Sequence, residues 1–75
     1  MGTNEFPDRL SGLMSKKGVS EYKIAHLCGV SRSTVWRWKK GTKKPTGDNY
    51  SRIADYFEVS VDFLMGRTDK AEVNR

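Results

Sequence analysis

The chain has 75 residues, of which 14 are Lys or Arg and 9 are Asp or Glu, so its formal net charge is +5. This length allows one small domain with a thin apolar core, which disfavours an enzyme with a deep active-site cleft. The sequence contains neither an apolar run long enough to cross a bilayer nor the charged-then-apolar amino terminus of an exported protein, so we expect a cytoplasmic protein that does not bind membranes.

Apolar spacing and candidate capping residues predict an all-α chain with five helices and no strands. The first helix is expected over Asp8–Lys17, starting near Pro7 and carrying Leu10, Leu13 and Met14 on one face. The remaining helices are expected at about 20–28, 32–40 and 47–57, with a short last helix that Ser60 caps and Gly66 ends.

The fourth helix and the carboxyl terminus differ sharply in polarity. Thr46 is a candidate cap for the fourth helix, whose predicted buried stripe is Tyr50, Ile53, Ala54 and Phe57. Residues 67–75 are polar and include only two isolated apolar side chains. We therefore expect one folded domain over residues 1–66 and a disordered tail over 67–75.

The second and third helices together have the pattern of a helix-turn-helix. Gly29 lies between them, where a sharp turn needs a left-handed backbone that glycine adopts without steric cost. Ala25 is small enough for the third helix to cross closely, and Val30 is expected to fill the gap between the helices. Ser20 and Ser31 are placed to cap the second and third helices.

The single cysteine argues against a metal centre as well as against an internal disulfide. His26 is the only histidine, and it precedes Cys28 by two residues, so on a helix the two side chains point in different directions. These residues cannot assemble a zinc site, and we expect no metal and no cofactor. Cys28 is instead predicted to be a small core residue.

The positive charge is concentrated in the third helix and the loop that follows it. Six of the 14 basic residues lie between positions 32 and 44, a stretch without any acidic residue, and the other eight are balanced by the nine acidic ones. Such a local excess is typical of a surface that binds a polyanion. A solvated basic face without a partner is the less informative alternative.

Several short motifs, in the same order and register, resemble the Cro and lambda-type phage repressor family of DNA-binding domains. They are Ile24-Ala25, Gly29-Val30-Ser31, Arg37-Trp38, Gly41, Pro45-Thr46, Ile53-Ala54-Asp55, Val59-Ser60 and Leu64-Met65-Gly66. The resemblance covers about residues 10–66 and implies a compact five-helix bundle. It also implies that the third helix lies in the major groove and that a homodimer binds a palindromic operator in double-stranded DNA.

Mapping this docking mode onto the third helix gives four candidate base contacts: Arg32, Ser33, Trp36 and Arg37. They lie on one side of the helix, opposite Val35 and Trp38, which are predicted to face the core. A guanidinium fork matches the O6 and N7 acceptors of guanine, so the arginines are the leading base readers, unless they only neutralise phosphates.

Trp36 is unusual because it falls on the exposed side of the third helix. Three roles are open for it: a contact with thymine methyls or sugars, stacking on Arg32 or Arg37, or packing against a neighbouring loop away from DNA.

Contacts with phosphates are expected from hydroxyl groups and from lysines around the two helices. The candidates are Ser20, Lys23, Ser31, Lys40, Lys43 and Lys44. Such contacts set the register on DNA and make affinity depend on salt, but they carry no sequence information.

Three residues depart from the family pattern. Glu21 stands where many members have a glutamine that bonds phosphate, and it is expected to turn toward Lys23 or Lys17 or simply to favour the helix dipole. Gly47 stands where an apolar residue is common and should weaken the start of the fourth helix. Leu27 replaces a polar residue, either as a partner contact or as a singly exposed leucine.

The sequence thus predicts a non-enzymatic, sequence-specific DNA-binding regulator, most simply a repressor of the phage or prophage type. An antitoxin or a restriction controller is the alternative within the same class. A module that binds an acidic protein through Trp36 and the basic face is the alternative from another class. Phe63, Leu64 and Met65 either complete the core or form a two-fold contact between protomers.

Overall fold

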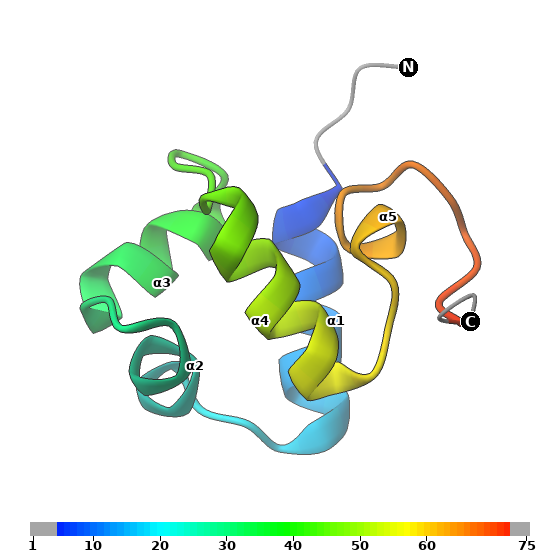
Figure 1. Ribbon diagram of the computed structural model, residues 1–75. Coiled ribbons are helices and arrows are strands. Elements are labelled where there is room, and N and C mark those ends of the chain that lie inside the picture. Colours follow the sequence, from blue (N-terminus) through cyan, green and yellow to red (C-terminus); the bar gives the residue numbers. More distant parts are fainter. Residues whose placement is uncertain (1–4, 73–75) are drawn as a thin grey trace.

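The computed structural model describes residues 5–72, which contain five helices and no strand (Figure 1). The helices are α1 (Phe6–Lys17), α2 (Glu21–Cys28), α3 (Arg32–Lys40), α4 (Gly47–Phe57) and α5 (Val61–Leu64). Their order confirms the predicted all-α five-helix bundle. None of the helices in this part of the chain combines the length and the apolar character that a bilayer crossing requires.

The first helix begins earlier than predicted, at Phe6 rather than at Asp8. Pro7 fits the first turn because backbone N–H groups have no helical partner there. Of the two additional residues, Phe6 matters for the core, since it is buried and packs edge-to-face against Trp38 and Tyr50, at centroid distances of 6.5 and 5.1 Å. Phe6 therefore joins α1, α3 and α4 at the centre of the molecule.

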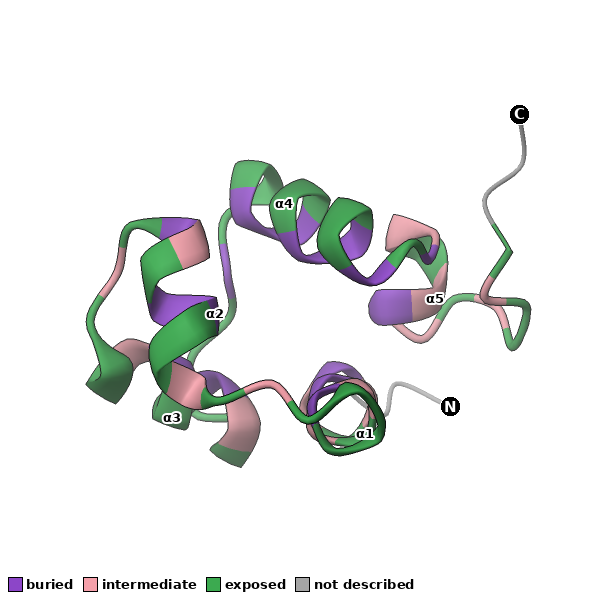
Figure 2. Cartoon of the chain, turned by 90° about the horizontal axis from the view of Figure 1, so that it is seen from below, coloured by how far each residue is buried: buried purple, intermediate pink, exposed green. Residues whose placement is uncertain are grey.

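The helices turn their buried stripes toward one shared core (Figure 2). The four predicted stripe residues of α4 are all buried, which confirms that stripe. Cys28 is buried as predicted, and burial raises the pKa of its thiol although nearby Arg52 acts in the opposite direction. Leu27 was expected to be a partner contact or a singly exposed leucine, and the second reading is wrong because the side chain is half-buried against the core.

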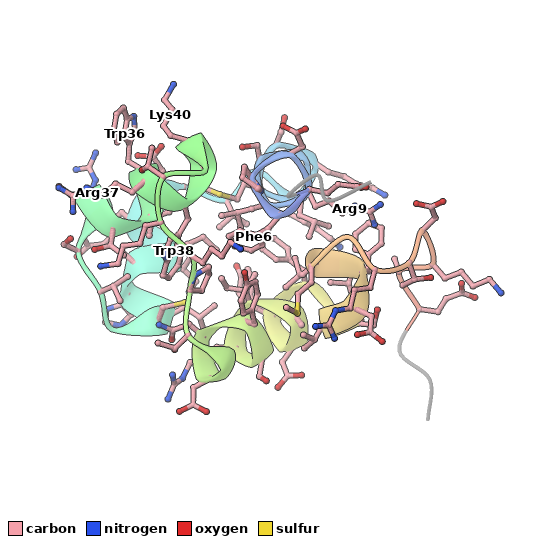
Figure 3. The ribbon with its side chains drawn as sticks, turned by 90° about the horizontal axis from the view of Figure 1, so that it is seen from above. Phe6, Arg9, Trp36, Arg37, Trp38 and Lys40 are labelled. Atoms are coloured by element: carbon pink, nitrogen blue, oxygen red, sulfur yellow. The ribbon has the colours of Figure 1, made fainter. Side chains whose placement is uncertain are left out.

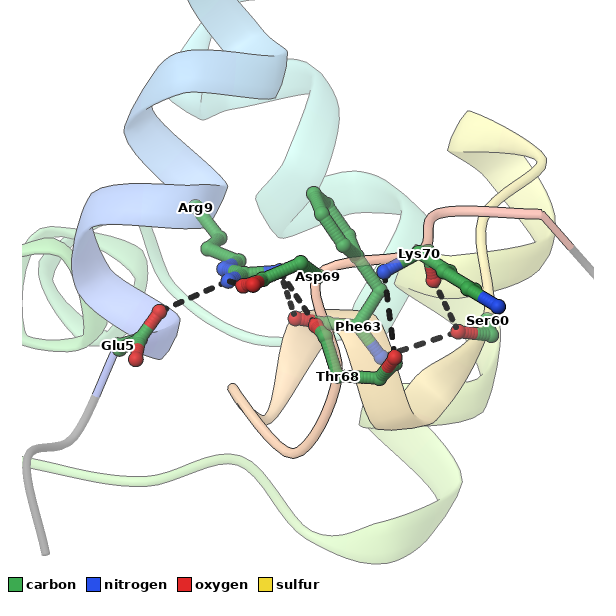
Figure 4. Close-up of polar contacts among 7 residues, drawn as sticks. All are labelled: Glu5, Arg9, Ser60, Phe63, Thr68, Asp69 and Lys70. Atoms are coloured by element: carbon green, nitrogen blue, oxygen red, sulfur yellow. Dashed lines mark hydrogen bonds and ion pairs between the residues drawn. The ribbon is translucent and has the colours of Figure 1, made fainter. Parts of the chain in front are cut away.

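The segment after α5 differs from the expected free tail, because residues 67–72 return to α1 and α5 (Figure 4). The guanidinium of Arg9 donates to the carbonyl oxygens of Phe63 and Thr68 and to the carboxylates of Glu5 and Asp69. Partial burial disfavours the charge of Arg9, but the bonds to the two carboxylates outweigh it and raise the pKa of the guanidinium.

Two further contacts hold the same segment against the start of α5. The backbone N–H of Ser60 donates to the carbonyl oxygen of Ala71 at 2.9 Å, and Ala71 packs on the core. Residues 73–75 of the predicted tail lie outside the described residues. The segment lies on the side of the molecule away from α2 and α3, so it leaves those helices uncovered (Figure 1).

Candidate nucleic-acid interface

Local hydrogen bonds set the positions of α2 and α3. Ser20 accepts a hydrogen bond from the backbone N–H of Lys23 at 3.1 Å, and Ser31 accepts one from Thr34 at 3.2 Å, which confirms both predicted caps. Between the helices, Gly29 has a φ of 68°, a left-handed conformation that costs glycine nothing. The chain therefore leaves α2 and enters α3 within three residues, as a helix-turn-helix requires.

The third helix has one buried face and one exposed face. Val35 and Trp38 are almost completely buried, as predicted, whereas Trp36 is 51% exposed. Figure 3 shows Trp36, Arg37 and Lys40 pointing outward from α3, while Trp38 points toward Phe6 in the interior. The buried face fixes the orientation of α3 and thereby the direction of its exposed side chains.

All four candidate base contacts line a single open hollow on this exposed face. Its lining consists of Glu21 from α2 together with Arg32, Ser33, Trp36 and Arg37 from α3. The structure thus brings the four predicted residues together and adds one carboxylate. Two guanidinium groups, a hydroxyl and an indole form a surface suited to the acceptors and methyl groups of base edges.

The ring of Trp36 lies next to a lysine. The Lys40 ammonium is 5.4 Å from the ring centroid, within the range of a cation–π contact. Because the two residues are four apart on α3, their side chains lie on the same face. Among the described cation–π contacts, Lys40 and neither arginine lies over the indole, and stacking on Arg32 or Arg37 stays a prediction.

Glu21 pairs with a residue that the sequence analysis did not consider. Its Oε2 accepts a hydrogen bond from Nζ of Lys39 at 3.1 Å, and both side chains are 29% exposed. The expectation that Glu21 turns toward Lys23 or Lys17 was wrong, because the start of α2 lies beside the edge of α3 that carries Lys39. That proximity is a tertiary contact between residues 18 positions apart.

The candidate phosphate contacts fall into three groups. Lys40, Lys43 and Lys44 are exposed at the end of α3 and in the following loop. Ser20 and Ser31 cap helices with their hydroxyls and remain exposed, and the Ser31 hydroxyl also shares a hydrogen bond of 3.1 Å with the hydroxyl of Thr34. Lys23 extends toward α4, where its ammonium lies 5.8 Å from the ring centroid of Tyr56, away from the hollow.

Comparison with known proteins agrees with the helix-turn-helix fold. The family model described as helix-turn-helix matches residues 13–64. The crystal structure of a transcriptional regulator from Listeria innocua has a similar fold, with a TM-score of 0.82 and 32% sequence identity. The match covers 97% of this chain and 64% of that chain.

Two curated relatives are similar in sequence. An uncharacterized HTH-type transcriptional regulator of Haemophilus influenzae is 39% identical over 92% of this chain and 28% of its own length. The HTH-type transcriptional regulator AnsR of Bacillus subtilis is 35% identical over 80% of this chain and 52% of its own length. The chain therefore spans about a quarter to a half of the length of these relatives.

The family match covers most of the chain and includes α2, the turn and α3. With the fold, the exposed basic helix and these relatives in agreement, the chain belongs to the Cro/C1-type helix-turn-helix family of DNA-binding transcriptional regulators.

Proposed function

We propose that this chain binds a specific sequence of double-stranded DNA and regulates transcription by occupying it, with α3 lying in the major groove. The observation that carries the proposal is the single hollow on which α3 gathers Arg32, Ser33, Trp36 and Arg37. Val35 and Trp38 anchor the opposite face of the helix in the core, so these side chains are presented by a rigid element.

Each of the four candidate base contacts has a chemically suitable target in the groove. Arg32 and Arg37 donate to O6 and N7 of guanine, each contributing about 1–3 kcal/mol of discrimination when the contact is bidentate. Ser33 bonds to either kind of base edge, and the indole of Trp36 packs against thymine methyl groups. The preferred half-site accordingly contains G·C pairs next to at least one thymine.

Contacts with the phosphates surround the hollow and provide the sequence-independent part of the affinity. Lys40, Lys43 and Lys44 supply the charge, with Lys23 on the α4 side. Ser20 and Ser31 supply hydroxyl groups at the starts of the two helices. With three to five phosphates neutralised per subunit, log K should fall against log salt concentration with a slope of roughly −3 to −4.5 per subunit.

We further propose that the chain acts as a repressor, as a homodimer on a palindromic operator, through the domain predicted over residues 1–66 together with the returning residues 67–72. Among the relatives, the cryptic phage CTXphi transcriptional repressor RstR of Vibrio cholerae is 30% identical over 80% of this chain and 54% of its own length. Occupancy by a dimer would place two copies of α3 about one helical turn apart along the duplex.

Selection of bound sequences from a random duplex library at roughly 0.15 M salt tests the proposal, because this salt concentration suppresses much of the purely electrostatic binding. We expect enrichment of a palindrome whose half-site centres are about one helical turn apart. A folded protein that enriches no sequence would overturn specific DNA recognition. It would leave the basic face to nonspecific DNA or to an acidic protein.

A further inference from the structure

The exposed face of α3 carries an aromatic ring with a cation beside it. The ammonium of Lys40 lies 5.4 Å from the centroid of the Trp36 ring, and the two residues are about one helical turn apart. Both side chains point outward from α3, away from the core (Figure 3). The pair therefore belongs to the same surface that presents the candidate base contacts.

The pair joins two parts of that surface. Trp36 lines the hollow, whereas Lys40 is the last residue of α3 and lies outside the lining. Lys43 and Lys44 are exposed in the loop that follows, and none of the described cation–π contacts involves them. Lys40 is thus held by a ring at the border between the hollow and the surrounding positive charge, and the two loop lysines are not held in this way.

A lysine that is already oriented loses less conformational freedom on binding than a free one. Its side chain is long and flexible, and ordering such a side chain at an interface costs entropy. A ring that attracts the ammonium restricts the side chain before DNA arrives. An ammonium has three donors that point in different directions, so contact with a ring leaves N–H groups for other partners. Lys40 is therefore able to keep the ring contact and donate to a phosphate oxygen at the same time.

We propose that Trp36 is a positioning residue that holds the Lys40 ammonium ready for a DNA phosphate beside the base-reading hollow. Trp36 is 51% exposed in spite of the lysine, so part of the indole stays free for the proposed thymine contact. The inference rests on the proposed function, since it assigns to one residue of that surface a second task, the orientation of a phosphate contact.

A double-mutant cycle between Trp36→Leu and Lys40→Gln tests the proposal, because leucine removes the aromatic face and keeps an apolar side chain. Affinity for the selected duplex is measured for all four proteins over a series of salt concentrations. With Trp36 present, Lys40→Gln should weaken binding about fivefold at 0.15 M salt and make the salt slope less steep by about 0.9 per subunit. With Trp36→Leu, the loss should shrink to about twofold, as expected when an exposed cation–π contact is missing.

Two matched variants and one signal of the free protein serve as controls. Lys44→Gln removes a loop lysine without a described ring contact, so its cost should be the same with Trp36 and with Trp36→Leu. Trp36→Phe keeps an aromatic face and should preserve most of the loss caused by Lys40→Gln. In NMR spectra of the free protein, the ring current of Trp36 should shift the Hε protons of Lys40 upfield, and Trp36→Leu should abolish that shift.

Several results would overturn the proposal. One is an equal loss from Lys40→Gln with Trp36 and with Trp36→Leu. Another is a larger loss with Trp36→Leu, because the ring would then hold the lysine away from the phosphate. A third is an equally reduced loss for Lys44→Gln, which would mean that Trp36 sets the docking of the whole surface. Absence of the upfield shift in the wild type would also contradict it.

The proposed function and this inference fail separately. If the wild-type chain prefers no sequence, the proposed function fails, and the same cycle is read on an unselected duplex because phosphates are common to all DNA. If the chain discriminates between sequences but Trp36 and Lys40 show no coupling, only this inference fails. Thermal unfolding of each variant verifies that it is folded.

Discussion

Two tryptophans on the same helix, two residues apart, serve opposite purposes. Trp38 is 1% exposed and Trp36 is 51% exposed, although both belong to α3. The third helix therefore carries a residue that holds the fold together beside one that it presents to solvent. Position on the helix, and not residue type, decides which role a large aromatic side chain takes.

The surroundings of the two rings differ in the same way. Trp38 packs edge-to-face on Phe6, and its indole nitrogen is buried without a hydrogen-bond partner among the described residues. Trp36 has the ammonium of Lys40 over its ring and borders the hollow. Substitutions at Trp38 should consequently affect stability, whereas substitutions around Trp36 should affect DNA binding.

The largest expected effect is that of Trp38→Ala. Removing this buried ring should lower the free energy of unfolding by about 3–5 kcal/mol, which is a large share of the stability of so small a domain. Urea titration followed by circular dichroism measures the loss, with Trp36→Ala as the matched control on the same helix. A Trp38→Ala variant as stable as the wild type would show that the two faces of α3 are wrongly assigned.

The next largest effect is expected for Arg37→Lys. Lysine keeps the positive charge but lacks the planar fork, so the variant should lose about 1–3 kcal/mol of discrimination between the selected duplex and one with the contacted guanine replaced. Competition binding at fixed salt measures this difference. If discrimination is unchanged and only the overall affinity falls, Arg37 contacts phosphate instead of a base.

Smaller and more uniform losses of DNA affinity are expected for substitutions in the loop after α3. Lys43→Ala and Lys44→Ala should each reduce the steepness of the salt dependence by about 0.9 per subunit and weaken binding about fivefold at 0.15 M salt. The loss should be the same for every duplex. Sequence-dependent losses would mean that these lysines take part in reading bases.

The smallest effect on stability is expected for Trp36→Ala. Because the side chain is half exposed, the free energy of unfolding should change by no more than about 0.5 kcal/mol. Affinity for the selected duplex should nevertheless fall. The fall should be larger for a half-site that contains the thymine than for one in which the thymine is replaced. Unfolding and DNA binding are measured on the same preparation. A Trp36→Ala variant that loses stability but keeps its affinity for the selected duplex would contradict the contrast with Trp38.

Local chemistry made much of the fold predictable from the sequence. The caps at Ser20 and Ser31 and the turn at Gly29 depend on residues within four positions of each other, and all three occur as expected. The division of α3 into a buried and an exposed face follows from helical periodicity alone. The hollow therefore contains all four predicted base-contact residues.

The missed features depend on contacts between distant parts of the chain. Several lysines were available to Glu21, and only the packing of α2 against α3 selects Lys39. Phe6 precedes a proline, which concealed its place in the first helix. The return of residues 67–72 uses backbone carbonyl groups such as that of Thr68 as acceptors for Arg9, and a carbonyl gives no signal in a sequence.

The most direct test follows the indole N–H signals of the two tryptophans by NMR while the selected duplex is added. We predict that the Trp36 signal shifts strongly, with the amides of residues 32–44, and that the Trp38 signal stays nearly in place. A second hollow, lined by Lys17, Val19, Tyr56, Phe57 and Glu58, serves as the internal comparison. Shifts centred on that hollow, with Trp36 unchanged, would contradict DNA recognition by the exposed face of α3.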